Sequence, residues 1–305
     1  METTGFCDVT RGVGQRQGCR ENARGMAMDF KTVGFKTVVQ GLGLTVLLAG
    51  SAAAQALETV GKPVDGKMGF QPAVTEMARD LQSLDYMINV IIIVITLFVT
   101  GLLLYAAWRF RASANPVPKA FTHNGPLEVA WTIVPVVILV FIGAFSLPVL
   151  FKSQEIPVAD ITIKTTGNQW YWSYEYVDEG VSFDSVLLER EDLAAAGYAD
   201  SDYLLATDTA VVIPIGKTIV VQVTGADVIH SWKVPAFGVM QDGVPGRLGQ
   251  LWFKAEREGV YFGQCSEICG KNHAYMPITV KVVSQEVYDT WLAGAKEGKL
   301  ELALN

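Results

Sequence analysis

The chain has 305 residues, of which 50% are hydrophobic and 18% are charged, and its formal net charge is −7. A hydrophobic fraction of one half is high for a purely soluble protein and indicates a chain with both membrane and aqueous parts. The negative charge argues against nucleic acid as a partner. From residue 152 to residue 305 the chain has 12 Lys and Arg against 21 Asp and Glu. This acidic half predicts either a basic partner or a surface that stays soluble through charge repulsion.

The N-terminal part has the pattern of a secretory signal. Residues 1–25 are rich in Arg and Gly without apolar periodicity. We expect them to be a mis-assigned extension, with translation starting at Met26 or Met28. Residues 26–54 combine a basic start, an apolar run and small residues, which is the pattern of a signal peptide cleaved before Gln55. The alternative is a genuine N-terminal tail.

Two apolar stretches predict a membrane hairpin. After an outer segment at residues 55–85, residues 86–108 contain no charged side chain and residues 127–151 contain one, Glu128. About 20 apolar residues suffice for a helix to cross a bilayer, and such helices tolerate proline. The loop at residues 109–126 carries Arg and Lys but no acid, which marks the cytoplasmic side. We therefore expect a multi-pass protein of the inner (cell) membrane, with both chain ends in the periplasm.

Beyond residue 157 the pattern changes to short alternating segments rich in β-branched residues. Strands separated by Gly and Pro turns predict a sandwich or barrel over residues 157–283. We expect a helical or irregular insertion at residues 187–205, and an amphipathic helix in the tail at residues 284–305. The expected strands are Ile161–Thr165, Gln169–Val177, Ala210–Ile215, Thr218–Thr224, Ile229–Val234, Gly249–Ala255, Val260–Gln264 and Ile278–Val283.

One short segment near the C-terminus concentrates soft metal donors. Sulfur ligands combined with imidazole favour copper among the available metals. A zinc finger would have C-x2-C and a closing His pair, and C-x3-C fits neither a thioredoxin motif nor a c-type haem site. His230 adds an imidazole from a predicted strand edge further upstream. The donors within the segment are two thiols, one imidazole and one thioether: Cys265, Cys269, His273 and Met276.

Simpler interpretations of these residues exist. In an oxidising periplasm Cys265 and Cys269 could form a disulfide, and His273 and Met276 could be ordinary loop and core residues. The joint presence of two imidazoles and a thioether favours copper instead. A mononuclear blue-copper site uses a single Cys, so the second Cys predicts two copper ions that share bridging thiolates. Spreading the redox electron over both ions suits an electron relay rather than a substrate pocket.

Several motifs carry a resemblance to a known family. The chain resembles subunit II of bacterial and mitochondrial cytochrome c oxidase over about residues 70–291. The resemblance implies a membrane α hairpin of two transmembrane helices plus an all-β cupredoxin-like barrel, in a respiratory-chain enzyme that reduces oxygen and pumps protons. It rests on the hairpin and on the runs QWYWSYEY (169–176), DVIHSW (227–232), VPGR (244–247) and CSEICGKNHAYMP (265–277).

The same resemblance implies a set of metal ligands. A dinuclear copper centre, CuA, would pass electrons to haem in subunit I. The Glu267 carboxylate would reach a magnesium ion shared with subunit I, and without the resemblance it would be a plain loop carboxylate. The implied copper ligands are two bridging thiolates, two terminal imidazoles, a weak thioether and a backbone carbonyl: Cys265, Cys269, His230, His273, Met276 and Glu267.

The resemblance also implies partners besides subunit I, the other oxidase subunits and the lipid membrane. Cytochrome c would deliver electrons at Trp170, whereas the rest of its aromatic run fits a strand core. Glu128 is either a first-turn carboxylate favoured by the helix dipole or part of a proton-uptake path into subunit I. Four acids would form the cytochrome c docking face, although each alone could be a solvated surface charge: Glu175, Asp184, Asp208 and Asp227.

Three other functions fit the residues less well. Subunit II of a quinol oxidase resembles this fold but lacks the copper ligands. Nitrous oxide reductase is a soluble enzyme with a large additional domain. A copper chaperone would need exposed, exchangeable ligands, whereas these are flanked by apolar residues. No C-x-x-C-H motif is present, so we expect no fused cytochrome c domain.

Overall fold

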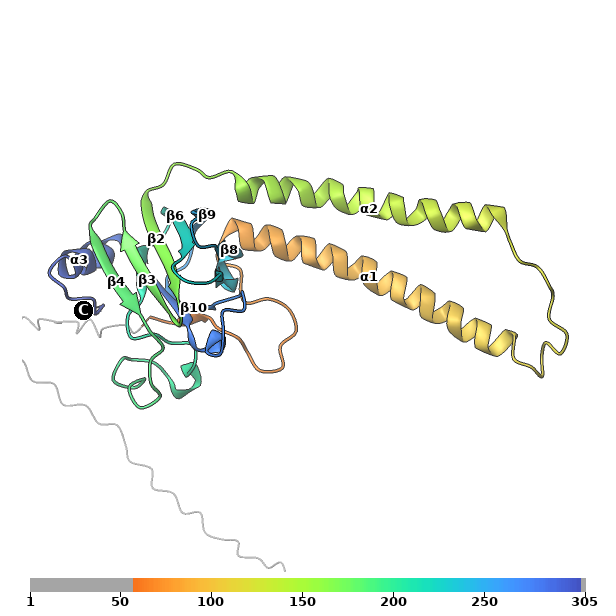
Figure 1. Cartoon of the computed structure of the whole chain (residues 1–305), viewed down its shortest axis with the longest axis horizontal. Coiled ribbons are helices and arrows are strands. Elements are labelled where there is room, and N and C mark those ends of the chain that lie inside the picture. Colours follow the sequence, from red (N-terminus) through yellow and green to blue (C-terminus); the bar gives the residue numbers. More distant parts are fainter. Residues whose placement is uncertain (1–56, 303–305) are drawn as a thin grey trace, which may run out of the picture. The chain divides into compact units, whose positions relative to one another are not determined.

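The computed structural model describes residues 57–302 of the chain. In this part a short strand, β1 (Thr59–Gly61), precedes two long helices, α1 (Glu76–Arg109) and α2 (Gly125–Gln154), and a β domain follows (Figure 1). The expected N-terminal extension and signal peptide, at residues 1–54, lie outside the described residues.

The two helices run side by side (Figure 1), and both are long and apolar enough to cross a membrane. Their large apolar side chains are exposed along most of their length. α1 starts well before its apolar run because Thr75 caps the first turn, accepting the Ala78 N–H at 3.0 Å. Asn124 caps α2 by accepting the Leu127 N–H at 3.3 Å, and α2 accommodates two prolines. The predicted pair of apolar helices is confirmed.

The β domain consists of two sheets and a two-stranded ribbon. One sheet has the order β4-β3-β2-β6-β9 and the other the order β1-β10-β11-β5, while β7 pairs with β8. A shared core includes the fully buried rings of Trp172, Trp232 and Phe237. The strands are β2 (Ile161–Asn168), β3 (Tyr171–Tyr176), β4 (Val181–Ser185), β5 (Val211–Pro214), β6 (Thr218–Gly225), β7 (His230–Val234), β8 (Val239–Gly243), β9 (Gly249–Lys254), β10 (Gly259–Gln264) and β11 (Pro277–Val283).

The all-β cupredoxin-like domain expected from the sequence is confirmed, and all the expected strands are present. The structure adds β1 before the helices, and β4 and β8 within residues 157–283. β4 and β8 are short, and their outward side chains include Asp184 on β4 and Met240 and Asp242 on β8, so neither shows a continuous apolar pattern. The expected insertion at residues 187–205 is irregular apart from a single 3₁₀ turn at Asp200–Asp202.

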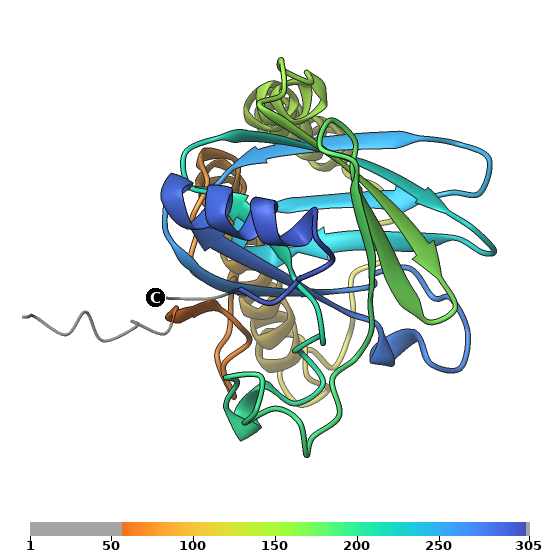
Figure 2. The ribbon, with the colours of Figure 1, turned by 90° about the vertical axis from the view of Figure 1, so that its left-hand side faces the viewer.

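The expected C-terminal helix is α3 (Gln285–Ala295), which packs against β5 and is drawn in blue in Figure 2. Ser284 caps it by accepting the Val287 N–H at 3.3 Å. Its inward side carries Trp291, whose ring centroid lies 5.3 Å from that of Tyr176. The helix is therefore amphipathic, as its sequence predicts.

Charged contacts join the helix pair to the β domain. Arg79 on α1 donates two hydrogen bonds to Glu256, at 2.7 and 2.8 Å. Lys152, near the end of α2, donates to Glu76 and Asp80 at the start of α1, at 2.7 and 2.6 Å. The Arg79–Glu256 pair therefore joins α1 to the β domain, and the Lys152 contacts join α2 to α1 at the same end of the hairpin.

Candidate metal centre

The predicted metal donors come from two places in the β domain. His230 is the first residue of β7, and the other donors lie on the loop between β10 and β11, hereafter the ligand loop (residues 265–276). β10 and β11 are antiparallel neighbours, with Gln264 opposite Pro277. The two ends of the ligand loop are therefore held together, and the loop folds back over the start of β7.

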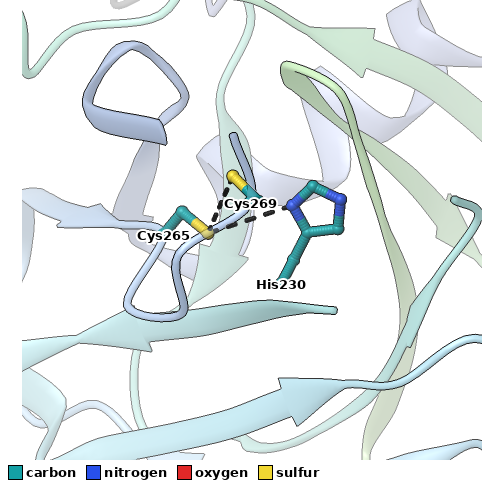
Figure 3. Close-up of side chains that lie close together, drawn as sticks. All are labelled: His230, Cys265 and Cys269. Atoms are coloured by element: carbon teal, nitrogen blue, oxygen red, sulfur yellow. Dashed lines mark hydrogen bonds between the residues drawn. The ribbon is translucent and has the colours of Figure 1, made fainter. Parts of the chain in front are cut away.

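The structure brings these donors together. His230, Cys265 and Cys269 have ligand atoms within 4.8 Å of one another, and all three residues are buried (Figure 3). Cys269 Sγ lies 3.9 Å from Cys265 Sγ, 3.5 Å from His273 Nδ1 and 3.5 Å from Met276 Sδ. Cys265 Sγ lies 3.9 Å from His230 Nδ1. Two thiols, two imidazoles and a thioether thus converge on one small region.

The two cysteines are free thiols in the described part of the chain. A disulfide has an S–S bond of about 2.0 Å, so the 3.9 Å separation of the sulfurs excludes one here. Metal–thiolate bonds of about 2.3 Å, as zinc forms them, allow one ion to bind two sulfurs at this spacing. The donor set is soft, buried and convergent, which fits copper better than it fits a disulfide or a closed zinc site.

Two glycines make the arrangement possible. A Cβ on Gly167 of β2 would lie 2.6 Å from His230 Cγ, so only glycine lets the imidazole sit against this strand. Gly270 follows Cys269 with a φ of +123°, a backbone conformation that side chains rarely adopt. A Cβ there would also crowd the ring of Trp170, at 3.0 Å. The sharp turn of the ligand loop therefore depends on glycine.

Further contacts hold several of the donor residues. His230 Nε2 lies 2.8 Å from Asp227 Oδ1, which leaves Nδ1 facing Cys265. The Glu267 carbonyl oxygen lies 3.3 Å from Cys265 Sγ, so this carbonyl faces the cluster as the resemblance implies. The Met276 carbonyl accepts the indole N–H of Trp172 at 3.2 Å. Ligand-supporting hydrogen bonds of this kind orient donors before a metal binds.

The donors influence one another's ionisation. Burial works against a charged imidazole, yet hydrogen bonds with Cys265 and Asp227 raise the pKa of His230 above its usual value. Burial also opposes ionisation of Cys265, but hydrogen bonds, above all with His230, lower the pKa of its thiol to about 7. Burial and the neighbouring Cys265 raise the pKa of the Cys269 thiol to about 12. One thiolate is therefore stabilised before metal binds.

Trp170 lies directly beside the ligand loop. Its indole N–H donates to the Cys269 carbonyl at 3.2 Å, and the Gln169 side-chain amide donates to the same oxygen at 2.8 Å. The Trp170 ring is half-buried rather than fully exposed, and Lys271 Nζ lies 5.8 Å from its centroid. The predicted electron-accepting ring thus touches the backbone of a predicted ligand.

The four predicted docking acids occupy different surroundings. Glu175 and Asp184 lie on the outer face of β3 and β4, where Glu175 pairs with Lys164 at 3.3 Å. Asp208 accepts the Val186 N–H at 2.9 Å. All four residues are exposed, but Asp227 also contacts His230. Exposure therefore does not separate the four acids, whereas contact with a predicted metal donor does.

The two remaining predicted residues are Glu267 and Glu128. Glu267 is half-buried on the ligand loop. Glu128 lies in the first turn of α2, where its Oε1 accepts the Asn124 N–H at 3.1 Å. That contact is the first-turn role expected for a helix carboxylate, so the plainer interpretation of Glu128 has direct structural support.

Sequence reasoning missed three supporting residues around the donors. The sequence places Gln169 in an aromatic run and Trp172 in the core, yet both donate to carbonyls of predicted ligands. It predicts docking for Asp227, not a contact with His230. Its position three residues before a predicted ligand is the signal that could have identified it, but in a loop such spacing does not fix a contact.

Comparisons with known proteins identify the family of the chain. The model of the cytochrome c oxidase subunit II periplasmic domain matches residues 161–283, and that of the transmembrane domain matches residues 63–149. Cytochrome c oxidase subunit 2 of Cereibacter sphaeroides is 59% identical over 275 residues, 86% of this chain and 91% of the relative. A probable cytochrome c oxidase subunit 2 of Rickettsia bellii is 43% identical, covering 76% of this chain and 85% of the relative.

Among solved structures, the periplasmic domain of subunit II of cytochrome oxidase from Bradyrhizobium japonicum is 47% identical. It covers 48% of this chain and 99% of that domain, with a TM-score of 0.44. The two family models together span most of the chain, and the high identity to the Cereibacter relative extends over nearly all of it. The chain therefore belongs to the cytochrome c oxidase subunit II family.

Proposed function

We propose that this chain binds a dinuclear copper centre, CuA, and relays electrons from cytochrome c to haem in subunit I of a proton-pumping oxidase. One observation carries the proposal: five soft or borderline donors converge within a few ångströms in a buried part of the β domain. The ligands would be Cys265, Cys269, His230, His273 and Met276, together with the Glu267 carbonyl. The bound copper would supply a one-electron redox couple shared over two ions.

The chain's own residues supply the rest of the site. Burial of both thiols and of Met276, at 5%, 3% and 1% exposure, keeps bulk water away from the sulfurs. The strands β7, β10 and β11 hold the donors from rigid backbone, so ligand positions need to change little between redox states. A site that is held in this way suits fast electron transfer better than it suits metal delivery, which requires exchangeable ligands.

Electrons would arrive at Trp170, because its ring is partly exposed on one side and its N–H bonds to the Cys269 carbonyl on the other. Cytochrome c is the proposed donor, steered by negative charge on this domain. The proposed docking acids are Glu175, Asp184, Asp208 and Asp227.

Two further roles are proposed for single acids. The Glu267 carboxylate would help to bind a magnesium ion shared with subunit I, since its backbone carbonyl already faces the thiols. Glu128 would lie at a proton-uptake path into subunit I from the cytoplasmic side. Replacing Glu128 with Gln should slow proton-coupled turnover and leave the copper spectrum unchanged; wild-type turnover would remove this role.

The central test is metal analysis with electron paramagnetic resonance on the full-length chain in detergent. The proposal expects two coppers per chain and a delocalised mixed-valence signal that reduced cytochrome c abolishes. One copper with a localised signal would indicate a mononuclear site. A metal-free protein with Cys265 joined to Cys269 would overturn the copper proposal altogether.

A further inference from the structure

We infer that Asp227 is a positioning residue that ties the predicted ligand His230 to the turn that carries Trp170. The effects on copper binding rest on the proposed function, whereas the contacts of Asp227 do not depend on it. The inference gives Asp227 a role different from that of the other three acids, with which the sequence groups it.

Both carboxylate oxygens of Asp227 are engaged. Oδ1 lies 2.8 Å from His230 Nε2 and accepts the Val228 N–H at 2.6 Å. Oδ2 accepts the Gln169 N–H at 2.8 Å. The side chain is 34% exposed, so these contacts, not burial, distinguish it. One short side chain therefore contacts two separate segments, the start of β7 and the turn between β2 and β3.

The contact with His230 determines which nitrogen of the imidazole carries the hydrogen. An ionised carboxylate only accepts hydrogen bonds, so His230 Nε2 must carry a hydrogen when it contacts Asp227. The lone pair of the neutral ring is then on Nδ1, which is the nitrogen that faces Cys265 at 3.9 Å. His230 is fully buried, so within the described residues Asp227 decides which nitrogen is available to a metal.

The contact with the Gln169 N–H holds the turn that carries Trp170. The turn at residues 169–170 is bonded to Asp227 through the Gln169 N–H and to the Cys269 carbonyl through the Gln169 amide and the Trp170 indole. It is thus held between a residue that orients one ligand and the backbone of another. A change at Asp227 should loosen the turn and the imidazole together.

The other predicted docking acids have no such link. Glu175 contacts Lys164, and Asp184 accepts the Ser173 hydroxyl at 2.6 Å. Asp208 bonds to Val186 and to its own neighbour Thr209. None of these contacts involves a metal donor, so Asp208 is a matched control that changes the same charge at a distance from the ligands.

The first measurement is copper retention by the full-length chain in detergent, in competition with a chelator. Asp227→Ala should weaken copper binding by about 10- to 100-fold, the usual effect of removing a ligand's hydrogen-bond partner, and should alter the paramagnetic resonance spectrum. Asp208→Asn should leave both unchanged.

Asp227→Asn separates the contact with His230 from the contact with the Gln169 N–H. Its single carbonyl oxygen can still accept from Val228 and His230, but the amide nitrogen then faces the Gln169 N–H, donor against donor. We expect near-wild-type copper retention in this variant. Amide hydrogen exchange at residue 169 should be at least about tenfold faster, because the hydrogen bond that protects it is lost.

The exchange measurement is made on copper-free protein, so it tests the hydrogen bond between Asp227 and Gln169 whether or not the chain binds copper. A wild-type chain that binds no copper would overturn the proposed function and leave this test intact. Wild-type copper retention, spectrum and exchange in Asp227→Ala would overturn the inference and leave Asp227 as a docking acid.

Discussion

The ligand loop and the acidic outer face of β3 and β4 use charge and polarity in opposite ways. At the loop, Cys265, Cys269 and the neighbouring His230 of β7 are buried, and each contacts another donor. On the outer face, Glu175 and Asp184 are exposed and contact a lysine and a hydroxyl. The loop therefore depends on individual contacts, whereas the face acts through its summed charge.

The physical reason is the difference in solvation. A buried polar group that loses its partner costs about 1–3 kcal/mol, because water cannot replace the lost contact. An exposed ion pair contributes about 0–1 kcal/mol, because water and salt screen it. Single substitutions should therefore have large effects in the loop and small effects on the face.

The largest effect is expected for Cys269→Ser. Cys269 Sγ contacts Cys265, His273 and Met276, and a serine oxygen is a hard donor that copper binds poorly. The variant should lose the dinuclear signal and most of its copper, as measured by metal analysis. Ser266→Ala is the control, since its hydroxyl contacts only the Gln264 carbonyl among the described residues. Full copper content in the Cys269 variant would contradict the ligand assignment.

A second loop-side effect is expected for Gly167→Ala. The added Cβ would lie 2.6 Å from the buried His230 ring, which has no room to move. Such overpacking costs about 1–3 kcal/mol, so both Tm and copper retention should decrease. In Gly249→Ala the three atoms nearest to the new Cβ would all belong to the flexible Gln241 side chain, the nearest being its amide nitrogen at 2.5 Å. Equal Tm losses in the two variants would argue against a special role for Gly167.

Much of this arrangement was predictable because it depends on local composition. Alternating β-branched residues and Gly or Pro turns give the strands, and long uncharged stretches give α1 and α2. The donor types in the ligand loop predict a soft metal whatever the fold. Contacts across the fold were not predictable: the position of Gly167 against His230 follows from the pairing of distant strands, and no spacing in the sequence encodes it.

The same distinction explains the assignment of Asp227. Its charge and its place near His230 are visible in the sequence, but its second contact, to the Gln169 N–H, spans 58 residues. The strands β4 and β8 were missed for a related reason. β4 alternates but has only two inward apolar side chains, Val181 and Phe183, and β8 has only Val239, so neither pattern is long enough to stand out in the sequence. Pairing with a neighbouring strand stabilises both, and context of that kind routinely overrides local propensity.

Ionisation within the loop gives a third test. The pKa of the Cys265 thiol is lowered to about 7, chiefly by its hydrogen bond with His230. In metal-free, reduced protein, thiolate absorbance should therefore increase as pH rises through about 7, with an amplitude of one thiol. His230→Ala should move this step to higher pH. Two thiols titrating together near their ordinary pKa would show that the loop does not distinguish them, since the pKa of Cys269 is raised to about 12.

On the acidic face, only a combined change should be measurable. The triple variant Glu175→Gln, Asp184→Asn, Asp208→Asn should slow cytochrome c oxidation by the assembled oxidase about tenfold at low ionic strength. The difference should shrink as salt is added, because screening removes steering. The copper spectrum should stay unchanged. A rate and salt dependence equal to wild type would refute the docking assignment, and a changed spectrum would mean that the face and the loop are coupled.

The smallest effect is expected where exposed charges serve only to hold the β domain on the helices. Arg79 and Glu256 form two short hydrogen bonds, but both side chains are nearly half exposed, at 49% and 44%. Water can replace most of what Arg79→Ala removes, so its Tm in detergent should fall much less than that of Gly167→Ala. Lys152 would still bind Glu76 and Asp80 in this variant. If the Tm loss were as large as that of Gly167→Ala, an exposed contact would contribute as much stability as a buried one. Exposure would then not explain the difference between the ligand loop and the charged surface.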